Sequence, residues 1–334
     1  MMTKRILAAL LATLLLLFGF TSCDTPNFIK EIFGEETETT RQQIPLPQVP
    51  ENSYLEVHFL DVGQADSALI VCDGQTMLID GGNRGAEDIV NPYLAERNIK
   101  HLNYVVATHP HADHYGGLTE ILHEVTADTI FSPFKKTDIP AFNRFVNYVH
   151  YTMRNQITVP TVGQQFYLGS ARVTVLGPLR LDYEDINDTS LVLKIEYGEL
   201  AFLFTGDMEG AAEIELVNTG VDLSADVIKV GHHGSYSSSW YQFLRAVAPK
   251  YGVISCGRDN EYGHPHESVL SRYRDADVKL YRTDLQGHIV CRSEDGKTLT
   301  FTTQMNPDAI TNPTAVKNDI SYLPTYLYYE EKFD

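Results

Sequence analysis

"THPHADHYGG", residues 108–117, gathers three histidines and an aspartate within six positions and closes with two glycines. The preceding run NYVVA (103–107) is typical of a buried strand, and residues 117–125 carry apolar side chains at helical spacing. We therefore expect His109, His111, Asp113 and His114 to lie in a loop between a strand and a helix, where functional residues are commonly placed. Imidazole nitrogens and carboxylate oxygens suit zinc and similar divalent ions. The stretch predicts a metal site in a domain that contains both strands and helices.

Two later strand-like runs also end in ligand-type residues. LAFLFTGD (200–207) ends at Asp207, and ADVIKVGHH (225–233) ends at His232 and His233. Taken alone, Asp207 is typical of a turn or a helix cap, and the histidine pair is typical of a solvated loop. Three such strand ends in one domain predict instead that they build one shared metal centre.

Short β-branched runs alternate with amphipathic stretches along the chain, and this α/β (α+β) pattern predicts sheets covered by helices. Helices are expected near residues 117–125, 141–154, 208–220, 240–247 and 268–273.

The motifs HPHADH, TGD and GHHGS resemble those of the metallo-β-lactamase superfamily. More narrowly, residues 54–291 resemble the extracytoplasmic hydrolase domain of ComEC-type competence proteins. The motifs that carry this resemblance are LDVGQADSALI, LIDGG, NDTSLVLKIEYG, VGHHGSYSSS, YGHPH and RTDLQG. The resemblance implies an αββα sandwich of the metallo-β-lactamase type, with a metal site at one edge of the paired sheets. It does not extend to the transmembrane channel of those proteins, so no role in DNA uptake follows from it.

The resemblance also implies a set of ligands for two divalent ions. His109 and His111 would hold the first ion, Asp113 and His114 would hold the second, and Asp207 would bridge them. One of His232 and His233 would complete the shell of the second ion, and the other would contact a substrate phosphate; the sequence does not choose between them. Asp80, in LIDGG, either supports the metal loop from behind or is a plain turn residue.

One position departs from the pattern of the superfamily. Many members supply a third histidine to the first ion where this chain has Asn187 and Asp188. His123 and His150 lie on predicted helices and are expected on the surface or in the core. Either Asp188 ligates in place of the histidine, or the first ion is held weakly. An oxygen-richer shell shifts the preference from zinc toward manganese, so the expected cofactors are two divalent ions, Zn or Mn.

Two divalent ions about 4 Å apart can hold a bridging water and lower its pKa. We expect this hydroxide to be the nucleophile, oriented by Asp113. His264 and His266, in YGHPH, are candidates for a phosphate contact or a general acid, with packing of a proline-stiffened turn as the alternative. The predicted function is that of a metal-dependent phosphodiesterase or nuclease. The alternatives are a hydrolase of thioesters, lactones or lactams, and a non-catalytic binding protein anchored at the cell surface.

The charge of the chain limits its substrates. It has 26 Lys and Arg against 44 Asp and Glu, a net charge of −18, which argues against general binding to a phosphate backbone. Lys135, Lys136, Arg258 and Arg282 form no dense basic run. A small phosphodiester or a single-stranded nucleic acid therefore fits better than a long duplex.

The ends of the chain predict export and attachment to a membrane. Lys4, Arg5 and the apolar run 6–20, followed by FTSC, are typical of a lipoprotein signal peptide (1–22) that leaves a lipidated Cys23; an uncleaved anchor helix is the alternative. Residues 23–52 are expected to be a flexible linker, 53–303 the hydrolase domain and 304–334 a C-terminal tail. The domain would then be extracytoplasmic and lipid-anchored to the bacterial cell membrane. The three other cysteines, Cys72, Cys256 and Cys291, are expected to be buried thiols, although export would permit oxidation.

Overall fold

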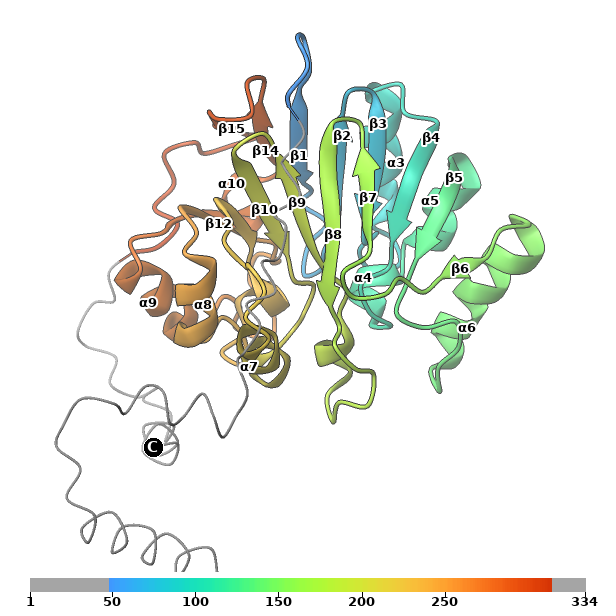
Figure 1. Ribbon diagram of the computed structural model, residues 1–334. Coiled ribbons are helices and arrows are strands. Elements are labelled where there is room, and N and C mark those ends of the chain that lie inside the picture. Colours follow the sequence, from blue (N-terminus) through green and yellow to red (C-terminus); the bar gives the residue numbers. More distant parts are fainter. Residues whose placement is uncertain (1–47, 314–334) are drawn as a thin grey trace, which may run out of the picture. The chain divides into compact units, whose positions relative to one another are not determined.

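Two β-sheets lie face to face in the part of the chain that the computed structural model describes, residues 48–313 (Figure 1). Sheet A has eight strands in the order β15-β14-β1-β2-β3-β4-β5-β6, and sheet B has seven in the order β13-β12-β11-β10-β9-β8-β7. The strands of sheet A are β1 (Leu55–Phe59), β2 (Ala68–Cys72), β3 (Gln75–Ile79), β4 (His101–Val106), β5 (Thr126–Phe131), β6 (Ile157–Thr158), β14 (Ile289–Ser293) and β15 (Thr300–Thr303). Those of sheet B are β7 (Gln165–Leu168), β8 (Ala171–Gly177), β9 (Val192–Tyr197), β10 (Leu200–Phe204), β11 (Val227–Lys229), β12 (Tyr251–Ile254) and β13 (Lys279–Arg282).

The alternation of side chains along each strand produces the layers. Because successive residues of a strand point to opposite faces, Val57 and Phe59 of β1 enter the core between the sheets, whereas His58 points outward and bonds Tyr93. Phe59 stacks on Phe204 of sheet B, with ring centroids 5.7 Å apart. The inter-sheet core is therefore apolar and is built by both sheets.

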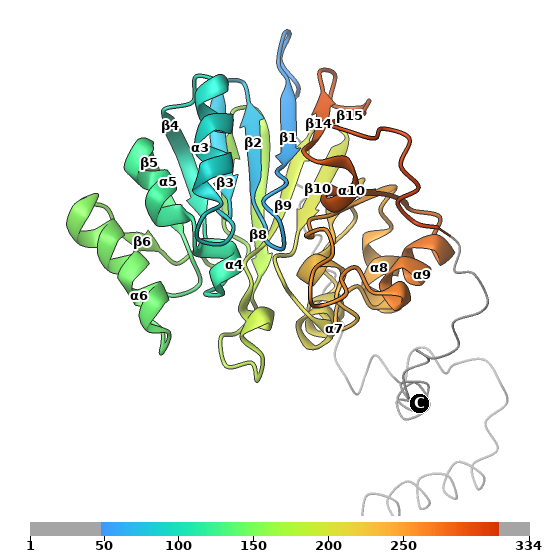
Figure 2. The ribbon, with the colours of Figure 1, turned by 180° about the vertical axis from the view of Figure 1, so that it is seen from behind.

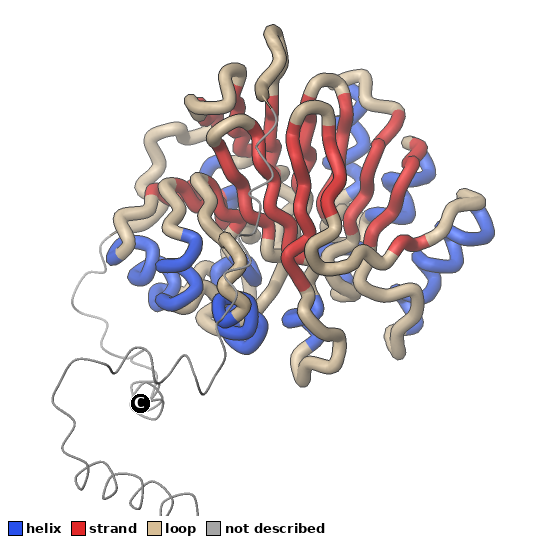
Figure 3. The backbone as a smooth tube through the Cα atoms, in the orientation of Figure 1, coloured by secondary structure: helices blue, strands red, loops and turns tan. Residues whose placement is uncertain are grey.

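Helices cover both outer faces of the sheet pair. They are α3 (Glu87–Glu96), α4 (Ala112–Tyr115), α5 (Leu118–Glu124), α6 (Pro140–Asn147), α7 (Gly210–Asn218), α8 (Tyr241–Val247), α9 (Glu267–Asp275) and α10 (Thr283–Gln286). Three helices, α3, α5 and α6, pack on sheet A, and Figure 2 shows α3 and α5 in front of its strands. Another three, α7, α8 and α9, pack on sheet B. The strands lie between these two sets of helices in Figure 3, which confirms the αββα sandwich.

Strand direction collects the functional loops at one edge. Strands β3 to β6 run parallel in sheet A, as do β10 to β13 in sheet B, and helices or loops make the crossovers. Ligand sites in α/β sheets form outside the carboxyl ends of such strands. The segments that follow β3, β4, β10 and β11 therefore meet, and each of them carries one of the motifs singled out above.

The five predicted helices are present, with small differences in their bounds. The segment at 141–154 is α6 from Pro140 onward, continued by a π-helical turn at Tyr148–Thr152. Helix α3 is not predicted by the sequence, because Pro92 lies inside it and proline usually marks a break. His123 and His150 are exposed on helical segments, as expected.

The predicted signal peptide, Cys23 and most of the linker lie outside the described residues, as do residues 314–334 of the tail. The described start of the tail packs on the domain, because Thr311 donates to Leu280 O of β13 and Asn312 donates to Leu270 O of α9. Within residues 48–313 no helix combines the length and the apolar character needed to cross a membrane. Cys72, Cys256 and Cys291 are buried free thiols, as predicted.

Candidate metal centre

The quoted motif occupies the turn that leaves β4. His111 is the N-cap of α4, a single turn of helix that carries Asp113 and His114. This turn is held by the loop after β3, since Gly81 N donates to His114 O at 2.7 Å. A Cβ at Gly117 would lie 2.3 Å from Gly81 O. The second glycine of the motif is therefore required by the close approach of these two loops.

The loops of sheet B supply the facing residues. Asp207 follows β10, and His232 and His233 lie in the short 3-10 turn after β11. Both histidines have positive φ, 47° and 53°, a conformation that is uncommon outside glycine and that persists where the surroundings enforce it. Here Ser238 donates to Gly231 O at 2.8 Å and fixes the turn.

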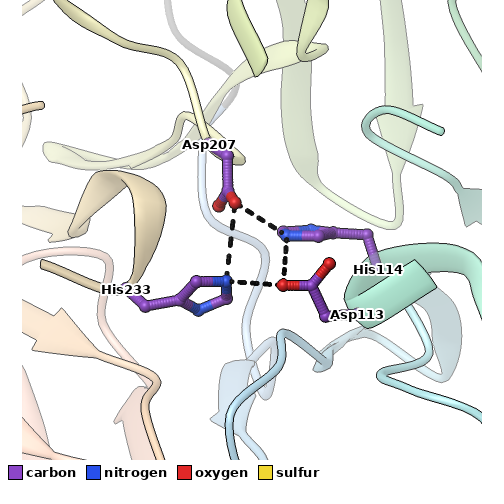
Figure 4. Close-up of side chains that lie close together, drawn as sticks. All are labelled: Asp113, His114, Asp207 and His233. Carbon is purple, nitrogen blue, oxygen red and sulfur yellow. Dashed lines mark hydrogen bonds and ion pairs between the residues drawn. The ribbon is translucent and has the colours of Figure 1, made fainter. Parts of the chain in front are cut away.

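Four side chains from the two sheets converge in Figure 4. One ligand-type atom each from Asp113, His114, Asp207 and His233 lies within 4.8 Å of the others. His233 Nε2 is 3.2 Å from Asp113 Oδ2 and 3.5 Å from Asp207 Oδ2, and His114 Nε2 is 3.1 Å from the same oxygen of Asp207. Of the histidine pair, His233 therefore faces the residues assigned to the second ion.

Asp207 also faces a second set of imidazoles. His109 Nε2 lies 4.0 Å and His232 Nε2 lies 3.8 Å from Asp207 Oδ2. The partly buried ring of His111 meets His109 edge-on, with ring centroids 4.8 Å apart. Asp207 Oδ2 is thus within 4.0 Å of four imidazole nitrogens, a position suited to a ligand shared by two ions.

Three buried atoms at the centre have no hydrogen-bond partner: His109 Nε2, His114 Nε2 and Asp207 Oδ1. These three residues are at most 1% exposed, and buried polar atoms are nearly always paired. Nitrogen lone pairs and carboxylate oxygens that converge without protein partners are what a divalent cation requires. The residues present therefore fit a metal centre.

Asp80 holds the metal loop from behind. It accepts hydrogen bonds from Thr108 N at 2.8 Å and from Thr108 Oγ1 at 2.7 Å, and it pairs with His114 Nδ1 at 2.8 Å. Once His114 has lost its second proton, the proton that remains sits on Nδ1, and the Nε2 lone pair is directed at Asp207. Such outer partners fix the tautomer of ligating histidines.

Glu209 plays the same part for His232, and it is not predicted from the sequence. Its Oε1 lies 2.7 Å from His232 Nδ1 and also accepts from Ser237 Oγ at 2.7 Å. The available signal is its place two residues after Asp207, where a glutamate reads as an ordinary first-turn residue of a helix.

Asp188, one of the two possibilities considered for the place of the missing histidine, is bonded to the start of α7 and is not among the four residues whose ligand-type atoms converge. Its Oδ1 accepts from Glu209 N at 2.8 Å and from Ala212 N at 3.4 Å. These amides belong to the start of α7, whose first N–H groups lack partners within the helix. The carboxylate is thus used as a helix cap, and His232 is the side chain that approaches Asp207 beside His109.

His264 and His266 line the rim of the cluster. Their ring centroids are 4.9 Å apart, and His264 lies 5.6 Å from His232. Gln64 Oε1 accepts from Gly257 N, so its amide nitrogen donates to His264 Nδ1 at 3.2 Å. Burial and the neighbouring histidines lower the pKa of His264 to about 3. It is therefore neutral near pH 7 and presents Nε2–H as a hydrogen-bond donor, which argues against its predicted use as a general acid.

Charges at the centre offset one another. Burial raises the pKa values of Asp113 and Asp207, but His114 and His233 outweigh it and hold both well below their usual range. Burial lowers the pKa values of His114 and His233, but Asp207 and a second carboxylate raise both well above 6.5. Burial and His114 hold the pKa of His109 well below 6.5. The carboxylates are ready to bind a cation, whereas His114 and His233 must first lose protons.

The serines that follow the histidine pair and the basic residues named above have structural partners or lie on the surface. Ser237 and Ser238 are used within the turn that holds the histidine pair. Arg258 donates to Asp284 O, and Arg282 forms an ion pair with the Asp284 carboxylate at 2.6 Å. Lys135 and Lys136 are exposed. None of these contacts forms a basic groove, in agreement with the low basic charge of the chain.

The chain is similar in sequence to a known protein superfamily and to competence proteins. A sequence profile of the metallo-beta-lactamase superfamily matches residues 60–258. The chain is 30% identical over 257 residues to ComE operon protein 3 of Bacillus subtilis (strain 168), covering 71% of this chain and 33% of that protein. It is 32% identical over 241 residues to competence protein ComA of Neisseria gonorrhoeae, covering 72% of this chain and 32% of that protein. The chain spans about a third of the length of these relatives, and the resemblance read from its motifs is confirmed.

Among solved structures, the metallo-beta-lactamase fold protein YhfI from Bacillus subtilis aligns with a TM-score of 0.49 and 11% identity, covering 74% of this chain and 100% of that one.

Proposed function

The chain belongs to the metallo-beta-lactamase superfamily of metal-dependent hydrolases, and we propose that it hydrolyses phosphodiester bonds with two divalent ions. The observation that carries the proposal is the position of Asp207, whose Oδ2 lies within 4.0 Å of the Nε2 atoms of His109, His114, His232 and His233. A carboxylate surrounded in this way is suited to bridge two cations.

The geometry supports two ligand sets that share Asp207. Asp113, His114 and His233 would hold one ion. His109, His111 and His232 would hold the other, so that His232 supplies the third histidine. Zinc and manganese both accept such nitrogen and oxygen donors. When bound, two divalent ions supply an activated water and neutralise charge on a phosphoryl group.

The rim of the centre supports a small or single-stranded substrate. Neutral His264 offers an N–H to a phosphoryl oxygen. Tyr262 and Tyr236 are 59% and 48% exposed, and their rings lie beside those of His264 and His266, with ring centroids 5.6 and 5.2 Å apart, respectively. Exposed aromatic rings beside a cleavage site can stack nucleobases without reading their sequence. The shortage of basic side chains disfavours a long duplex.

The relatives add a separate line of support. One relative is named competence protein ComA, and a 31% identical relative of Haemophilus influenzae is called recombination protein 2. Both names refer to processes that involve nucleic acid. Because the chain covers only about a third of these proteins, the activity of the whole relatives is not carried over.

The test is hydrolysis of bis-(p-nitrophenyl) phosphate by the purified chain with Mn²⁺ or Zn²⁺, together with elemental analysis for about two ions per chain. Asp207→Ala is expected to lower the rate more than about 100-fold, beyond the usual effect of outer partners. Asp188→Asn is the matched control, since Asp188 is also buried but caps α7. Turnover of a chromogenic lactam, lactone or thioester without any phosphodiester turnover would contradict the proposal, and so would stoichiometric ligand binding without turnover.

We also propose that the domain is held outside the cytoplasm by a lipid on Cys23. The support is the basic, apolar and small-residue order of the first 23 residues. Cys23→Ser is expected to move the protein from the membrane fraction to the soluble fraction of the exported material. Retention of the variant in the membrane would favour an uncleaved anchor helix instead.

A further inference from the structure

A lysine lies buried beneath the metal centre. Lys229 ends β11, four residues before His233, and only 4% of its surface is exposed. Lys229 lies two residues after Val227 and therefore on the same face of β11, so its side chain points into the space between the sheets. Its Nζ lies 2.7 Å from Asp66 Oδ2 and donates to Val230 O at 2.7 Å. Lysine is almost never fully buried unless it is paired, so this position has a specific cause.

The partner of Lys229 belongs to the opposite sheet. Asp66 lies in the loop between β1 and β2, is 5% exposed, and its N–H donates to the carbonyl of Asp113 at 3.1 Å. Its Oδ1 is 3.2 Å from His233 Nδ1, which donates to Ser255 O at 3.0 Å. Asp66 thus touches a candidate ligand of each sheet, Asp113 through its backbone and His233 through its side chain.

This pair differs from the other ion pairs of the domain. Within residues 48–313 it is the one Lys or Arg pair whose side chains are both less than a tenth exposed. It lines a cavity of about 10 Å³ together with Asp80 and Thr108, which support His114. The pair therefore lies directly behind the ligands and not at a remote part of the core.

A buried ion pair is weak evidence for stability, because desolvation of both charges offsets much of their attraction. Fixing the register of packed elements is the best-attested use of such pairs. The geometry of the metal centre depends on how the two sheets are placed, since Asp113 and His114 follow a strand of sheet A whereas Asp207 and His233 follow strands of sheet B. A shift between the sheets would change the distances between the two halves of the site.

We infer that Lys229 and Asp66 are positioning residues of the metal centre, whose ion pair holds the ligands of sheet A against those of sheet B. Asp66 orients His233, and the ammonium group of Lys229 occupies the place beside Asp66 that a stray cation would otherwise take. The inference rests on the proposed metal site but not on the identity of the substrate.

The test measures metal affinity without turnover. Calorimetric titration of the purified full-length chain with Mn²⁺ is expected to show affinity 10- to 100-fold weaker, on the order found for outer partners of ligands, in Lys229→Met. Lys194→Met is the matched control, because Lys194 is 5% exposed in the same sheet and pairs with Asp222 at 2.8 Å, with no contact to a candidate ligand. Its metal affinity is expected to stay within about twofold of the wild type.

A double variant separates positioning from folding. Lys229→Met leaves the Asp66 carboxylate buried and unpaired, so thermal stability falls, and adding Asp66→Asn removes that charge and restores it. If the pair positions the ligands, the double variant regains stability while its affinity for Mn²⁺ stays weak. Wild-type affinity in Lys229→Met, or recovery of affinity together with stability in the double variant, would overturn the inference. Absence of metal binding by the wild type would overturn it together with the proposed function, whereas metal binding without phosphodiester turnover would remove the proposed function alone.

Discussion

Replacing Asp80 by asparagine tests the centre with a change of one atom. Asp80 is 1% exposed and binds three groups, namely Thr108 N, Thr108 Oγ1 and His114 Nδ1. The asparagine oxygen must stay on Thr108 N, because that amide can only donate. The new NH₂ group then faces His114 Nδ1, which has to become an acceptor. The proton of His114 moves to Nε2, the atom that faces Asp207.

The size of the effect follows from these contacts. Loss of one hydrogen bond that involves a charged group costs about 1.5–3 kcal/mol. The hydroxyl of Thr108 can rotate to accept from the new NH₂ group, so the loss of folding stability should stay near the lower end of that range. Metal binding is affected differently, because freeing Nε2 for a metal forces the remaining proton of His114 back to Nδ1, where it faces the NH₂ donor of the asparagine. Changes of outer partners reduce metal affinity about 10- to 100-fold, and we expect Asp80→Asn to reach the upper part of that range.

Calorimetric titration with Mn²⁺ or Zn²⁺ and thermal unfolding of the metal-free protein together measure both effects. Asp188→Asn is the control, since its remaining oxygen still accepts from the two amides of α7. We expect unchanged metal affinity in that variant. A folded Asp80→Asn protein that binds two ions as tightly as the wild type would refute the assignment of His114 Nε2 as a ligand.

Three further predictions address charge, substrate and the serine-rich turn. The pKa values of His114 and His233 are raised well above 6.5 in the metal-free protein, so the stability that their protonated rings contribute is complete below about pH 6.5 and is lost as the pH rises through the folded values. Metal affinity should rise over the same range, by up to about tenfold per pH unit for each proton displaced. Metal titrations and unfolding curves between about pH 6 and 9 check both trends. Tyr262→Ala should raise the KM for a single-stranded oligonucleotide about tenfold, the effect of one lost base stack, whereas Tyr151→Ala, also at an exposed ring, should not change it. Burial raises the pKa of Glu213 to about 8. At a pH above that value, Glu213→Gln should cost about 1–3 kcal/mol in denaturant unfolding, because both carboxylate oxygens accept from backbone N–H groups, at 2.6 and 2.9 Å, and the amide can satisfy only one of them.

The sequence predicts the centre well where the ligands follow strands. His109, His114, Asp207 and His233 each come directly after a strand or within the next turn, so a run of β-branched residues followed by a ligand-type residue was enough to find them. Parallel neighbours in each sheet then bring those ends together. The packing of one sheet on the other cannot be predicted from strand patterns, because alternation identifies the buried face of each strand but not the sheet that covers it. That part of the fold follows from the family resemblance.

The outer partners could not be predicted in the same way. Asp66 and Glu209 lie in turns where acidic residues are common, and only the contact between the sheets makes Asp66 a neighbour of His233. Asp188 shows the converse difficulty. Its motif position suggested a ligand, whereas the start of α7 provides two backbone amides that its carboxylate satisfies. Local sequence does not show such competition between a metal and a helix end.

The carboxylates gathered between the two sheets explain why folding and metal binding should be coupled. Asp66, Asp80, Asp113 and Asp207 are brought together from both sheets, and Lys229 alone cannot balance four carboxylates in a buried space. Without metal, protons on His114 and His233 supply the missing positive charge, which is the cause of their raised pKa values. One divalent ion carries the same charge as those two protons and would replace them, whereas a second ion would add two further positive charges against the carboxylates. Metal should therefore stabilise the sheet pair most at alkaline pH, where the histidines can no longer do so.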